Sequence, residues 1–138
     1  MDDLTTELDL DAIRVFLHLL GVCGWVGGQL VMGALVPVLR KVSPEAPRLA
    51  AERFGRVAWA CFALAVVTGV WGLAAVEVAD RSGGYHAALL VKLLLVGASG
   101  AAAAIHGTTN SVVVRAATGA AAALTALGAL LAGAILVA

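Results

Sequence analysis

Two histidines and one lysine, His18, His106 and Lys92, stand within or at the edge of long apolar stretches of this sequence. A lysine at the centre of a membrane-spanning helix costs about 2.5–3.5 kcal/mol on insertion scales, so such residues are usually functional. Neutral imidazole is a common ligand of haem iron, copper and zinc. His18 is therefore the leading candidate for a cofactor ligand, and Lys92 is a candidate for a charge at similar depth.

The spacing of these residues gives each of them a helix face. Lys92, Ser99 and His106 follow one another at intervals of seven residues, and His18 and Trp25 have the same separation. Residues seven apart share one side of an α-helix. The two polar stripes predict that the first and third helices face each other, with His18, Trp25 and Lys92 near one cofactor. The alternative is packing alone, because lipid turns polar side chains inward even where no ligand is bound.

His106 would belong to a separate metal site. It lies about 25 Å from His18 along the membrane normal, by the rise of an α-helix, so one ion cannot bind both. An interfacial residue at a helix end is the other interpretation of His106. Met32 and Cys61 are soft ligands that suit Cu(I), which leaves copper as an alternative to haem. Known nucleotide-binding and hydrolase motifs are absent from the sequence, so the question of enzymatic activity stays open.

The composition requires these residues to sit in a membrane. Hydrophobic residues make up 62% of the 138 residues and charged residues 13%, against about 45–50% and about 25% in soluble domains. A chain this short cannot bury so much apolar surface within itself. The lipid bilayer is therefore the expected partner. The formal net charge of zero gives no electrostatic case for binding nucleic acid.

A spanning helix needs about 20 mostly apolar residues. Four stretches satisfy this in a single transmembrane domain, namely 13–39, 57–78, 85–105 and 112–137. Pro44 and Pro47 interrupt the chain after the first stretch, and polar turns follow the second and third. Because two of the connections are short, neighbouring helices should be antiparallel. The predicted fold is all-α, an integral membrane four-helix bundle with up-down-up-down topology.

Basic residues predict the orientation. The connection 40–56 carries five of them, namely Arg40, Lys41, Arg48, Arg53 and Arg56. Basic loops stay in the cytoplasm. We therefore expect a multi-pass protein of the plasma membrane with both termini external. Gly24 and Gly28 form a close-packing motif, which serves either the bundle or association with a second copy. A membrane redox partner is the other candidate protein partner.

The first three apolar stretches resemble a known superfamily. FLHLLGVCGWVGG (16–28), AERFGRVAWACFALAVVTGVWGL (51–73) and LLVKLLLVGASGAAAAIHG (89–107) resemble the first three helices of CopD-like copper-resistance membrane domains and HemJ-type protoporphyrinogen oxidases. In the oxidases, the histidine similar to His18 is regarded as a haem ligand, and Lys92 corresponds to a third-helix lysine. The resemblance implies haem b between the first and third helices, in a redox or haem-handling role. A copper-handling or transport component and an accessory subunit without chemistry are the alternatives.

Overall fold

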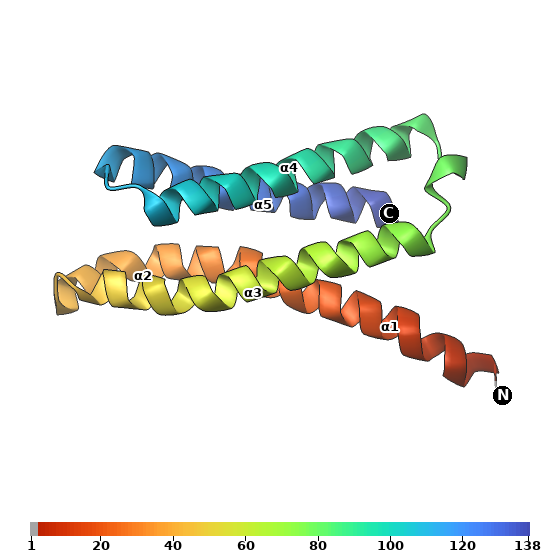
Figure 1. Cartoon of the computed structure of the whole chain (residues 1–138), viewed down its shortest axis with the longest axis horizontal. Helices are drawn as coiled ribbons and strands as arrows, with labels where there is room; N and C mark the ends of the chain where they lie inside the picture. Colours follow the sequence, from red (N-terminus) through yellow and green to blue (C-terminus); the bar gives the residue numbers. More distant parts are fainter. Residues whose placement is uncertain (1–2) are drawn as a thin grey trace. The chain divides into compact units, whose positions relative to one another are not determined.

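The structure is a computed structural model that describes the backbone of residues 3–138 and the side chains from Leu10 onward. No β-strand occurs in that part of the chain. The helices are α1 (Asp3–Val22), the π-helical turn η1 (Cys23–Gly27), α2 (Gly28–Val42), α3 (Ala46–Ala75), the 3-10 turn η2 (Val78–Asp80), α4 (Gly83–Thr108) and α5 (Val112–Val137) (Figure 1). The all-α prediction is confirmed.

Four helical stretches are long and apolar enough to cross a membrane. Their bounds are Leu10–Val42, Ala46–Ala75, Gly83–Thr108 and Val112–Val137. The first runs through α1, η1 and α2 without a break. Many large apolar side chains on these helices are exposed, as expected of surfaces that face lipid rather than water. The chain thus has the helices of a multi-pass membrane protein.

The connections follow local backbone chemistry. α2 ends at Val42 because Ser43 takes an extended conformation and Pro44 follows it. Helix α3 begins at Ala46, well before position 57, so the basic segment before the apolar span is itself helical. Pro47 lies in the first turn of α3 rather than in the loop, and there its missing N–H is not needed. Ser111 accepts a hydrogen bond from the backbone N of Val114 at 3.3 Å, so its side chain caps the N-terminus of α5.

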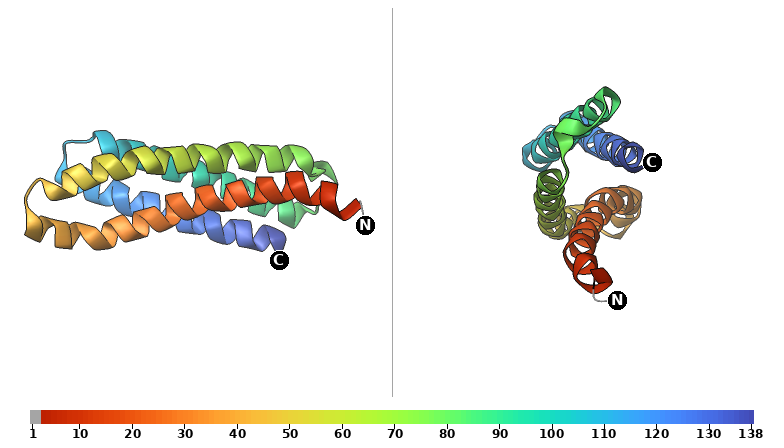
Figure 2. Two further views of the ribbon diagram at one scale, coloured as in Figure 1. Left: turned by 90° about the horizontal axis from the view of Figure 1, so that it is seen from below. Right: turned by 90° about the vertical axis from the view of Figure 1, so that its right-hand side faces the viewer.

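The chain divides into two compact units, the first ending at Glu77 and the second beginning at Val78. Each unit is a helical hairpin. In the first unit α3 runs back along α1 and α2, and in the second α5 runs back along α4 (Figure 2). The short connections explain both hairpins, because adjacent helices joined by a few residues must be antiparallel neighbours.

Small residues bring the helices of the first hairpin together. A β-carbon built on Gly21 would lie 2.7 Å from the backbone of Ala65 and of Cys61, so the two helices nearly touch there. One built on Gly24 would lie 2.3 Å from the Cys61 sulfur, and one on Gly28 would lie 2.5 Å from the Phe54 ring. The predicted glycine motif therefore serves packing within the hairpin.

Candidate functional site

His18 is held against α3 by two hydrogen-bond acceptors. Its Nδ1 lies 2.9 Å from the carbonyl oxygen of Ala65 and 3.1 Å from the hydroxyl oxygen of Thr68. The Thr68 hydroxyl donates its own proton to the Leu64 carbonyl at 2.6 Å, so its oxygen can only accept from His18. Nδ1 therefore carries a proton, and in the neutral imidazole the lone pair lies on Nε2.

Two glycines of α3 make room for the polar face of α1. A β-carbon on Gly69 would lie 3.3 Å from Cε1 of His18, and one on Gly72 would lie 2.8 Å from Nη1 of Arg14. The Arg14 guanidinium also pairs with Asp11 at 3.2 Å, one turn away on its own helix. Small residues at these positions let α1 place an imidazole and a guanidinium close to the α3 backbone.

Trp25 lies on the same side of the first stretch as His18. It is 6% exposed, and its ring centroid is 5.4 Å from Trp59 and 4.5 Å from Phe62, both on α3. Aromatic pairs at such separations stabilise an interface beyond their buried area. Trp25 lies in the π-helical turn η1, seven residues after His18. Its ring joins an aromatic cluster that packs the first helical stretch against α3. The side chain of Gln29 donates to the Trp25 carbonyl at 3.1 Å.

The polar stripe of α4 faces α5. The Ser99 hydroxyl, 1% exposed, donates to the carbonyl of Ala122 at 2.8 Å. His106 places Nδ1 2.8 Å from the carbonyl of Arg115. A β-carbon on Gly133 would lie 3.1 Å from the Lys92 Nζ atom. The three residues therefore share one face of α4, as their seven-residue spacing predicts.

Each stripe contacts its own hairpin partner, α3 for His18 and Trp25, and α5 for Lys92 and His106. The close approach of His18 and Lys92 stays a prediction. Lys92 and His106 lie fourteen residues apart on one helix, about 21 Å by its rise, so they cannot serve one centre.

Sequence reasoning missed the residues that orient His18. Thr68 is 2% exposed. Ala65, Thr68 and Gly72 stand at positions i, i+3 and i+7 and so share one face of α3. This recurrence of small and polar residues within the second apolar stretch was the available signal. The residues identify the face of α3 that receives His18.

Among the side chains that the structure describes, no three His, Cys, Asp or Glu residues gather closely enough to hold a metal ion. A structural zinc site uses four such ligands, whereas haem iron needs one or two from the protein. A single oriented imidazole could therefore serve as an axial ligand of haem iron. No family model, curated protein or solved structure was found to match the chain.

Replacing Ser99 with alanine should lower the stability of the α4–α5 hairpin by about 0.6–1.7 kcal/mol, the range of interhelical hydrogen bonds in membranes. The loss follows because the Ser99 hydroxyl bridges to the backbone of α5. Thermal unfolding in detergent measures it. Thr118→Ala is the matched control, since that hydroxyl bonds only within its own helix in the described structure. Equal effects of the two substitutions would contradict a bridging role for Ser99.

Proposed function

We propose that this chain is a small multi-pass membrane protein that binds haem b through His18, in a redox or haem-handling role. The hydrogen bond from Nδ1 of His18 to the carbonyl of Ala65 carries the proposal. A metal-bound histidine almost always donates its other ring N–H to such an acceptor, which orients the ring and raises the basicity of the ligating nitrogen. The bonds to Ala65 and Thr68 thus support the proposal by fixing the ring orientation and the tautomer that a ligand binding through Nε2 would need.

The surroundings of His18 also suit this role. The ring is half-buried between two helices of spanning length, and it packs against Gly69 of α3, where a β-carbon would lie 3.3 Å from its Cε1 atom. The cluster of Trp25, Trp59 and Phe62 supplies an apolar wall on the same hairpin. Bound haem would supply one-electron chemistry at its iron. The protein residues would hold the macrocycle, exclude water and keep the proton on Nδ1 of His18.

The absorption spectrum tests the proposal. The full chain, expressed with ample haem and purified in detergent, should show a Soret band and about one haem per chain, as expected of one axial site. Haem content measured as the pyridine haemochrome checks the ratio. Purified protein that is folded and shows no Soret absorbance would exclude the haem function.

An accessory subunit without chemistry is the second candidate. It is favoured by hydrogen bonds that intramembrane polar groups make within their own hairpin. His18 bonds to Ala65 in the first, and Ser99 bonds to Ala122 and His106 to Arg115 in the second. Such bonds are what packing alone requires. This candidate expects no haem and no copper in the purified protein, and only a loss of stability when His18 is replaced.

The orientation is part of the proposal. With Cys23 and Cys61 replaced by alanine, an impermeant thiol reagent should label Ser82→Cys in intact cells and should not label Glu45→Cys. The reason is that the basic connection 40–56 should stay in the cytoplasm, which places residues 80–84 outside. Labelling of Glu45→Cys and not of Ser82→Cys would show that the chain has the opposite orientation.

A further inference from the structure

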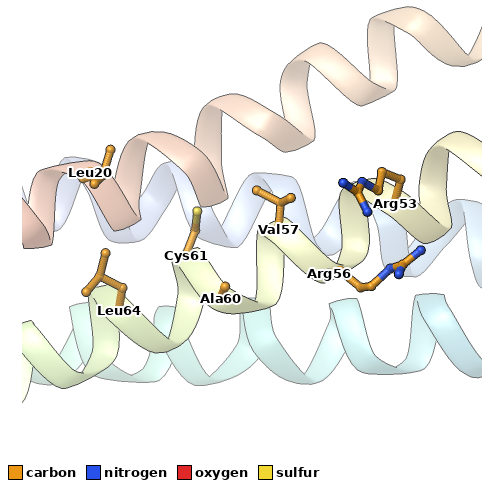
Figure 3. Close-up of a pocket in the computed structure, with 7 residues that line it drawn as sticks. All are labelled: Leu20, Arg53, Arg56, Val57, Ala60, Cys61 and Leu64. Atoms are coloured by element: carbon orange, nitrogen blue, oxygen red, sulfur yellow. The ribbon is translucent and has the colours of Figure 1, made fainter.

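A groove runs along α3 in the first unit, and it has a basic end. Its volume is about 510 Å³, and its lining residues come from α1 and α3, namely Leu20, Arg53, Arg56, Val57, Ala60, Cys61 and Leu64. Figure 3 shows the two arginines at one end and Leu20 with Leu64 at the other. The groove is therefore amphipathic along its length, cationic at one end and apolar along the rest.

The depth of the groove follows from the length of α3. The helix has 30 residues, about 45 Å, whereas the hydrocarbon core of a bilayer is about 30 Å thick. The apolar part, 57–75, is about 28 Å long and fills that core by itself. Arg53 and Arg56 precede it, so they lie at the level of the lipid headgroups. Arg56 and Leu64, at the two ends of the groove, are about 12 Å apart along the axis of α3 by the helical rise. This length is close to the hydrocarbon thickness of one leaflet, about 15 Å.

The charge at the basic end is uncompensated within the groove. None of the residues that line it is acidic. The nearby acid Glu52 pairs with Arg48 at 3.5 Å. Arg53 and Arg56 are one turn apart and both are exposed, so their guanidinium groups can approach the same anion. Arginine binds phosphate oxygens in a bidentate manner, which suits a headgroup phosphate.

We propose that this groove binds an anionic phospholipid. Arg53 and Arg56 hold the headgroup phosphate, and one acyl chain lies along the apolar face formed by Val57, Ala60 and Leu64. The charge, the headgroup depth and the length of one leaflet all match this occupant. Basic pockets at the cytoplasmic surface commonly bind anionic lipid headgroups in this way. The proposal is independent of haem binding by His18.

Native mass spectrometry of the full chain in detergent tests this site. The protein is mixed with equal amounts of phosphatidylglycerol and phosphatidylcholine that carry identical acyl chains. Wild-type protein should retain one phosphatidylglycerol in preference to phosphatidylcholine by about 10–30-fold, the effect of two basic residues near a membrane surface. Arg53→Gln with Arg56→Gln should reduce this preference to near unity.

The control removes the same charge elsewhere. Arg40→Gln with Lys41→Gln deletes two cations from the end of α2, outside the groove, and should leave most of the preference intact. If this control lowers the preference as much as the groove variant does, binding is a diffuse charge effect and the site is wrong. Excess inorganic phosphate should not displace the lipid, and displacement would mean that the arginines bind a free anion instead.

The acyl chain has its own test. Ala60→Leu places a larger side chain in the groove and should weaken retention of phosphatidylglycerol, whereas Ala63→Leu lies outside the groove on the same helix and should not. Both alanines are exposed, so both variants should fold, which circular dichroism checks. Retention unchanged by Ala60→Leu would show that no acyl chain lies along this face of α3, and the proposed groove site would be wrong.

Discussion

Replacing His18 with alanine should abolish the Soret band of the purified protein while leaving an inserted, helical chain. The substitution removes the imidazole that Ala65 and Thr68 orient from α3, and with it the axial ligand on which the proposed haem site depends. The measurement is the absorption spectrum of the variant beside that of wild type at equal protein concentration. Far-UV circular dichroism confirms that the helices are retained.

Two further substitutions show whether the centre has been placed correctly. His106→Ala should leave the spectrum unchanged, because this residue contacts the backbone of α5 at the end of α4 far from Lys92. Lys92→Met should weaken haem binding or shift the reduction potential of the haem without removing the band, because we expect the Lys92 ammonium to pair with a haem propionate. Loss of the band in His106→Ala, with the band intact in His18→Ala, would show that the ligand is His106.

Replacing Gly21 with valine should destabilise the first hairpin more than any other single glycine change in it. The added β-carbon would lie 2.7 Å from backbone atoms of both Ala65 and Cys61, and backbone cannot rotate away as a side chain can. Overpacking costs about 1–3 kcal/mol, and we expect the upper end of that range. Thermal unfolding in detergent measures the loss.

A graded series provides the control for this prediction. Gly28→Ala should cost less than Gly21→Ala, because its β-carbon meets only the Phe54 ring, which can turn. At Gly33 of α2, no atom of a neighbouring described residue lies within 4 Å of an added β-carbon. Gly33→Ala should therefore be neutral or slightly stabilising. Equal losses at all three positions would show that α1 and α3 are not in tight contact at Gly21.

The helices themselves were predictable from the sequence. Apolar runs of spanning length, separated by Pro44 and by polar turns, determine how many helices form and roughly where each lies, because a bilayer accepts only closed backbone hydrogen bonding. The cap at Ser111 and the close-packing role of Gly24 and Gly28 also follow from local residue chemistry. The early start of α3 did not follow, since its first turns are polar and apolar content does not mark them.

Periodicity in the sequence determined which residues share a helix face, as with Lys92, Ser99 and His106, because that depends only on the turn of the helix. The tertiary structure decided which neighbour each face meets: α5 for this stripe and α3 for His18 and Trp25. A repeat along one helix carries no information about the position of another. The proton on Nδ1 of His18 was likewise decided by tertiary structure, since the acceptors on Ala65 and Thr68 lie 47 and 50 residues away in sequence.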